Sequence, residues 1–98
     1  MIWIYCKTVD DPKTVGEFIC KANAPQEEDE RRSWVIQDEN ESGTYTIGVA
    51  CRDSTAAMVY RIGHSVVVIE VDANCAPNVI EPLIEKYGFD NVKWLLVN

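Results

Sequence analysis

The stretch RDSTAAMVYRIGHS, residues 52–65, decides the fold of this 98-residue chain. Asp53 or Ser54 can cap a helix that ends at Gly63, and we expect such a helix here. The same residues also fit a strand that turns at Gly63 and His64. The choice between helix and strand therefore sets the order of the remaining elements.

The segments that follow predict a strand, a helix and a last strand. SVVVIEV, residues 65–71, is a β-branched run typical of a central strand buried on both faces. NVIEPLIEKYG, residues 78–88, has an apolar stripe, a terminal glycine, and Asn78 and Glu81 at capping-box spacing. NVKWLLVN, residues 91–98, should form a strand parallel to residues 65–71, reached by a right-handed crossover.

The N-terminal segment predicts a strand followed by a helix. Asp11 as N-cap and Pro12 at the first helical position start an amphipathic helix that should stop before Pro25. In the residues before this helix, side-chain character alternates with the period of a strand that has two unlike faces. One face of this strand would carry Ile2, Ile4 and Cys6, and the other Trp3, Tyr5 and Lys7.

Residues 32–51 predict a β-hairpin. The apolar runs RRSWVIQ and TYTIGVAC flank DENESG, in which Asn40, Ser42 and Gly43 supply turn chemistry. The tip of this hairpin is acidic.

Together these elements predict one α+β domain over residues 1–98. The expected order is βαββαβαβ, with a mixed sheet covered by helices on one face. This order resembles the ferredoxin-like sandwich with one extra helix and strand. The resemblance concerns the fold alone, because this fold hosts many unrelated functions.

The charge of the chain is concentrated in one segment. The net charge is −7, which disfavours nucleic acid and anionic membranes as direct partners and favours basic proteins. Arg31 and Arg32 neutralise only two of the acids in residues 27–41, so this segment carries −5. This segment is either a solvated face or a recognition surface for a basic partner. The acids are Glu27, Glu28, Asp29, Glu30, Asp38, Glu39 and Glu41.

The residues offer no catalytic, metal or cofactor motif. His64 is the only histidine, and a lone histidine beside a glycine more often lies at an element end than in a catalytic site. The glycines are isolated and form no phosphate-binding loop. Four cysteines lie far apart, which predicts free thiols and no zinc site. We therefore expect neither an enzyme nor a cofactor.

Trp3 and Tyr5 share one face of the first predicted strand. Aromatic residues on an open sheet can stack on single-stranded RNA, but the acidic charge disfavours that role. We expect them to contact a protein partner or to pack under the extra helix of the predicted sandwich.

These observations favour a non-enzymatic acidic protein that blocks a basic, nucleic-acid-binding or nuclease-type surface of a partner. Immunity proteins, antitoxins and phage-encoded inhibitors work in this way. The partner-binding residues would be the seven acids together with Trp3 and Tyr5. The alternatives are a ligand-sensing regulatory module and a structural subunit that dimerises through Trp3, Tyr5 and the terminal strand with Trp94. The N-terminus lacks a secretory leader and no run could span a bilayer, so we expect a soluble, cytoplasmic protein.

Overall fold

Residues Thr55–Ile62 form a strand, β4, in the computed structural model, so the helix predicted for this stretch is wrong. Ala57 and Val59 are buried while Met58 between them is exposed, which is the period of two expected of a strand. The strand ends in a turn in which Gly63 has φ +63°, a conformation that favours glycine. The glycine that resembled a helix end therefore belongs to a hairpin between β4 and the next strand.

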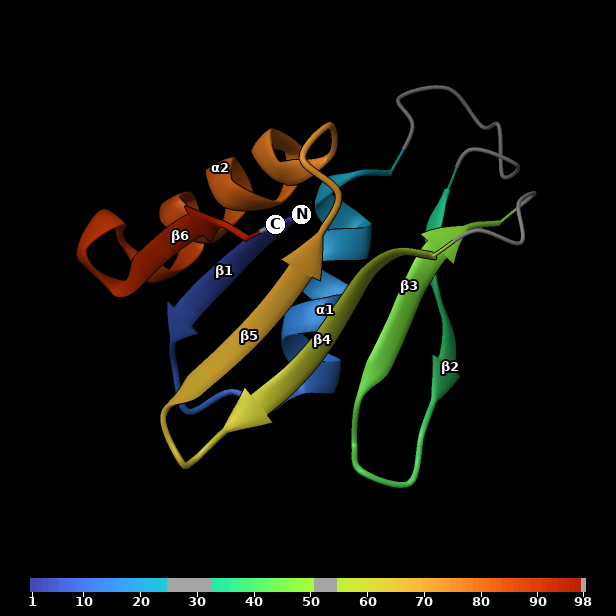
Figure 1. Cartoon of the computed structure of the whole chain (residues 1–98), viewed down its shortest axis with the longest axis horizontal. Coiled ribbons are helices and arrows are strands. Elements are labelled where there is room, and N and C mark those ends of the chain that lie inside the picture. Colours follow the sequence, from blue (N-terminus) through green and yellow to red (C-terminus); the bar gives the residue numbers. More distant parts are fainter. Residues whose placement is uncertain (25–32, 51–54, 98) are drawn as a thin grey trace.

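The structure describes residues 1–24, 33–50 and 55–97, and these ranges contain six strands and two longer helices (Figure 1). The elements are β1 (Ile2–Lys7), α1 (Pro12–Ala22), β2 (Trp34–Glu39), β3 (Tyr45–Val49), β4 (Thr55–Ile62), β5 (Val66–Val71), α2 (Ala76–Tyr87), the short 3-10 helix η2 (Phe89–Asn91) and β6 (Val92–Leu96).

The six strands form one sheet in the order β2-β3-β4-β5-β1-β6, and every neighbouring pair is antiparallel. The predicted ferredoxin-like sandwich with the order βαββαβαβ and a mixed sheet is therefore wrong. The observed order is βαββββαβ, because β4 is a strand that pairs with both β3 and β5. Strands β5 and β6 run in the same direction, as predicted, with β1 between them.

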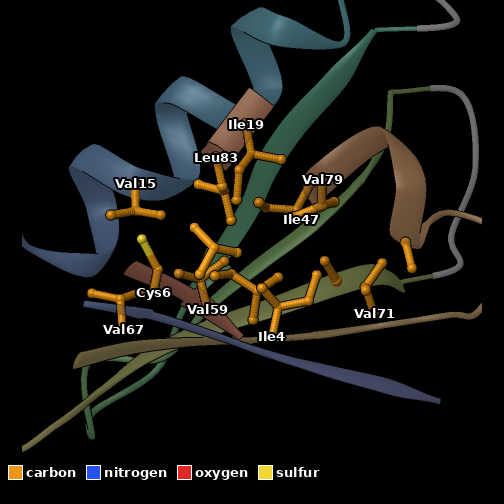
Figure 2. Close-up of a cluster of buried hydrophobic side chains, with 14 residues drawn as sticks. Ile4, Cys6, Val15, Ile19, Ile47, Val59, Val67, Val71, Val79 and Leu83 are labelled. Atoms are coloured by element: carbon orange, nitrogen blue, oxygen red, sulfur yellow. The ribbon is translucent and has the colours of Figure 1, made fainter. Parts of the chain in front are cut away.

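Both helices cover one face of the sheet, and the core lies between them and the strands (Figure 2). Val15 and Ile19 of α1 and Val79 and Leu83 of α2 point towards the sheet. Removing aliphatic side chains of this size from water is the main favourable contribution to folding. The strands contribute Ile4, Cys6, Ile47, Ala57, Val59, Val67, Ile69, Val71 and Val92 to the same buried cluster.

Helix α1 begins as the sequence predicts, whereas α2 begins earlier. The Thr14 main-chain N–H donates to Asp11 Oδ1 at 2.7 Å, which satisfies one of the free donors of the first turn of α1. Helix α2 starts at Ala76 after Cys75, which makes no side-chain capping bond. The capping box predicted from Asn78 is therefore wrong, because Asn78 already lies inside the helix.

Candidate functional site

The predicted hairpin is confirmed, and its tip is held in shape by Asn40. Asn40 Oδ1 accepts hydrogen bonds from the main-chain N–H groups of Ser42 and Thr44, both at 3.0 Å. The Gly43 main-chain N–H donates to the Asn40 main-chain oxygen at 3.0 Å, and Gly43 has φ +81°. Such a three-residue connection with a glycine at its end is common between antiparallel strands. The exposed side chains of Glu39 and Glu41 therefore extend from an ordered turn.

Tyr45, at the start of β3, lies among three carboxylates. Its hydroxyl donates to Glu39 Oε1 at 2.7 Å across the hairpin. This hydrogen bond is the main cause that raises the pKa of Tyr45 to about 12, and the negative charges of Asp11 and Glu17 act in the same direction. Helix α1 and the hairpin thus bring their acids together, although 28 positions of the sequence separate Asp11 from Glu39. We call Asp11, Glu17, Glu39 and Glu41, together with Tyr45, the acidic surface.

Two interactions fix the acidic end of α1. Arg61 donates hydrogen bonds to the main-chain oxygens of Val9, at 3.2 Å, and of Asp10. These bonds fasten the loop before α1 to strand β4. The Thr14 main-chain N–H donates to the capping carboxylate of Asp11 and holds the pKa of Asp11 below its usual value. Asp11 therefore stays ionised at neutral pH, and its negative charge acts on Tyr45.

The structure separates the predicted site residues into different places. Glu39 and Glu41 belong to the acidic surface, whereas Asp38 pairs with Thr46 and so lies on the opposite face of the sheet. The predicted residues Glu27, Glu28, Asp29 and Glu30 lie outside the described residues.

Trp3 and Tyr5 lie on the face of the sheet that no described helix covers. Trp3 aligns with Glu70, then Met58, Thr46 and Asp38, one residue on each successive strand. Four strand spacings separate Trp3 from Asp38, which is about 19 Å. Trp3 therefore lies on the same face of the sheet as Asp38 but far from it, whereas Glu39 and Tyr45 lie on the other face.

The uncovered face has its own apolar centre. Val68 on β5 is fully buried, although it does not belong to the cluster under the helices. Its register partners are Tyr5 on β1 and Tyr60 on β4, so the two tyrosines flank and cover it. Burial and a hydrogen bond to Glu70 raise the pKa of Tyr60 to about 12. Tyr60 is not among the predicted site residues, because the sequence pattern of residues 54–62 favours a helix, in which Tyr60 would not lie on this sheet.

The described residues hold no candidate metal centre. They contain no group of three His, Cys, Asp or Glu side chains that could hold a metal ion. His64 is exposed in the β4–β5 turn, where Arg61 donates to its main-chain oxygen at 3.0 Å. None of the helices in these ranges is long and apolar enough to cross a membrane.

Comparison with known proteins gives no assignment: no family model, no curated protein and no solved structure matches this chain.

Proposed function

We propose that the chain is a non-enzymatic, cytoplasmic binding protein whose acidic surface covers a basic surface of a partner protein. The partner would be of nucleic-acid-binding or nuclease type, and the role that of an immunity protein, an antitoxin or a phage-encoded inhibitor. The hydrogen bond from the Tyr45 hydroxyl to Glu39, together with the negative charges of Asp11 and Glu17 that also act on Tyr45, supports this proposal. Glu39 comes from the β2–β3 hairpin, whereas Asp11 and Glu17 come from the start and the middle of the α1 region, yet all three act on the same tyrosine.

Electrostatics gives this surface a physical role. Carboxylates grouped at one end of a molecule with a net charge of −7 attract a basic protein during diffusion and raise the association rate. A tyrosine among them adds an amphipathic ring, the type of side chain that is enriched at binding hot spots. The partner would bring arginine or lysine side chains to the carboxylates and displace part of their water.

The experiment has two steps, and the first is capture of partners. The protein is immobilised, exposed to an extract of its source cell at low salt, and washed with increasing salt. We expect a basic protein that binds at low salt and elutes as salt rises, because salt screens interactions between exposed charges.

The second step compares two variants that remove the same charge from different places. One variant carries Glu17→Gln, Glu39→Gln and Glu41→Gln in the acidic surface, and the amide oxygen introduced by Glu39→Gln can still accept the hydrogen bond from Tyr45. The control carries Glu81→Gln, Glu85→Gln and Asp90→Asn, three exposed positions on α2 and η2. We expect the first variant to associate with the captured protein at least about tenfold more slowly, and the control to change the rate much less.

Two outcomes would oppose the proposal. Equal effects of both variants would show that only net charge matters and that the acidic surface is not the contact. Thermal stabilisation by a small ligand, with no basic protein captured, would favour the ligand-sensing alternative instead.

A further inference from the structure

The two edges of the sheet differ in how they are protected against pairing with another strand. Strand β2, at one edge, has an irregularity in its pairing between Ile36 and Asp38 and exposes Gln37, Asp38 and Glu39. Bulges and charged side chains are the usual means by which proteins prevent edge-to-edge association. Strand β6, at the other edge, lacks both features except for the single charge of Lys93.

Strand β6 also exposes large apolar side chains. Trp94, Leu95 and Leu96 are 44%, 48% and 63% exposed, and Phe89 in the preceding turn is 67% exposed. Phe89, Val92, Lys93 and Trp94 line a shallow hollow of about 240 Å³ beside the strand. A regular, apolar edge strand is a template for pairing with a further strand.

The backbone groups of β6 that face outwards can be identified from the pairing. The Val97 main-chain N–H donates to the Met1 main-chain oxygen at 2.9 Å, so the backbone of Val97 faces β1. In an antiparallel pair this orientation alternates along the strand. Lys93 and Leu95 therefore also face β1, whereas the N–H and C=O groups of Trp94 and Leu96 face the open edge.

We propose that the open edge of β6 pairs with β6 of a second copy of this chain, antiparallel, about a two-fold axis through Leu95. Trp94 of each copy would then exchange two backbone hydrogen bonds with the partner's Leu96. These four bonds use all outward N–H and C=O groups of Trp94 and Leu96. Six strands from each copy would join into one sheet of twelve.

With the two-fold axis at Leu95, more main-chain N–H and C=O groups find hydrogen-bond partners than with the axis at Trp94. With the axis at Trp94, the partner's Leu96 oxygen would need the Val92 N–H, which already donates to the Phe89 oxygen. With the axis at Leu95, the Val92 N–H is not required. No donor or acceptor among Trp94 and Leu96 is then left without a partner.

The side chains of β6 also match a second copy of the same strand. On the face under the helices, Trp94 would contact the partner's Leu96 twice by symmetry. On the open face, Leu95 would contact the partner's Leu95 at the axis. The two Lys93 residues would lie about 14 Å apart, beyond the Debye length at physiological salt. The contact is thus apolar at its centre and places no like charges together.

The charge distribution favours a second copy over the basic partner at this edge. Strand β6 carries a positive charge and no carboxylate, so it has no attraction for a basic protein. The irregular β2 edge disfavours head-to-tail pairing of β6 with β2, so the assembly should close at two copies. The acidic surface lies on α1 and the β2–β3 hairpin and would stay free, so this inference does not depend on the proposed function.

Sedimentation analysis over a wide range of protein concentration tests the assembly. We expect the mass to rise with concentration from one chain of 11.1 kDa to two, and not further. Leu95→Lys would place two ammonium groups at the axis and should give a monomer with unchanged circular dichroism. The matched control Ile62→Lys alters an apolar side chain of β4 that is 52% exposed and lies away from this edge, and should still dimerise.

Cysteine cross-linking tests the register. Facing residues that do not exchange hydrogen bonds have Cα atoms about 4.5 Å apart, within the range that a disulfide spans. Leu95→Cys should therefore form a reducible dimer under mild oxidation, whereas Lys93→Cys and the parent chain should not. A mass of one chain at every concentration, growth beyond two chains, or equal cross-linking at positions 93 and 95 would overturn the proposal.

Discussion

The side-chain amide of Asn23 donates a hydrogen bond to the main-chain oxygen of Asn78 at 3.0 Å, which links the end of α1 to the start of α2. Asn78 needs this partner because the residue four positions later is Pro82, which has no N–H to donate. The same amide of Asn23 also donates to the main-chain oxygen of Ile19 at 2.9 Å and so caps the C-terminal end of α1. One side chain thus satisfies acceptors at two helices.

This relationship predicts coupling between two distant positions. Asn23→Ala should lower the free energy of unfolding by about 1 kcal/mol, a typical value for a lost hydrogen bond. In a Pro82→Ala background the loss should be smaller by about 0.5 kcal/mol, because the N–H of residue 82 can then donate to Asn78. Urea denaturation of the four proteins in this cycle measures the coupling. Equal losses in both backgrounds would contradict the role assigned to Asn23.

Short sequence patterns predicted those elements whose structure depends on residues close to one another in the sequence. Asp11 and Pro12 gave the start of α1, and the turn residues around Gly43 gave the β2–β3 hairpin, because capping and turn geometry involve residues close in sequence. Strand β4 was assigned wrongly because its apolar pattern fits either a helix or a strand. Residues Thr55–Ile62 form a strand because they pair with β3 on one side and β5 on the other. This pairing is a tertiary effect that the local sequence does not contain.

The candidate site was predictable only in part, for the same reason. Glu39 and Glu41 were identified from the local excess of charge. Asp11 and Glu17 were not, because they join Tyr45 only when α1 packs over the sheet beside β3. Asp38 and Glu39 are neighbours with side chains on opposite faces of the sheet, which follows from the strand period and the irregularity after Ile36.

The hydrogen bond from Tyr45 to Glu39 predicts an alkaline titration that depends on the carboxylate. Tyr45 should lose its proton near pH 12 and not near the ordinary value of 10. The protonated phenol is favoured in the folded state, so its contribution to stability is complete below pH 10 and is lost as the pH rises towards about 12. Glu39→Gln should bring the pKa of Tyr45 closer to 10.

Phenolate absorbance measures this titration, and the difference between each protein and its Tyr45→Phe variant isolates Tyr45. Glu41→Gln is the matched control, because it removes a carboxylate from the same hairpin that does not bond to Tyr45. If Glu39→Gln and Glu41→Gln lowered the pKa of Tyr45 equally, general charge and not the hydrogen-bonded carboxylate of Glu39 would be the cause.

Gly16 in α1 offers a stabilising substitution. It is buried, and an added Cβ would lie 3.5 Å from Ile36 Cδ1 and 3.7 Å from Ile47 Cδ1, which are ordinary van der Waals contacts. Alanine in a helix interior is favoured over glycine, so Gly16→Ala should raise the free energy of unfolding by about 0.5–1 kcal/mol. Gly43→Ala should instead destabilise the protein, because Gly43 has φ +81°. Thermal denaturation of the Gly16→Ala and Gly43→Ala variants measures both changes in stability. A loss of stability for Gly16→Ala would show that the helix cannot accommodate the methyl group.

The cysteines predict slow thiol reactivity in the folded protein. Cys6, Cys20 and Cys75 are free thiols, while Cys51 lies outside the described residues. Burial raises the pKa of Cys6 and of Cys20 to about 11, with smaller contributions from Asp10 and Glu17 respectively. At about pH 8 both thiols are therefore almost entirely protonated, and the thiolate is the reactive form.

A thiol-reactive disulfide reagent at about pH 8 should reveal two slow thiols that become fast in denaturant. Cys6→Ala and Cys20→Ala should each remove one slow phase, which assigns the phases to residues. We expect four thiols in denaturant and no change of melting temperature with reductant, because the cysteines lie far apart in the sequence and form no pair. Fewer than four thiols in denaturant would reveal a disulfide, and rapid reaction of all thiols in the native protein would contradict the burial of Cys6 and Cys20.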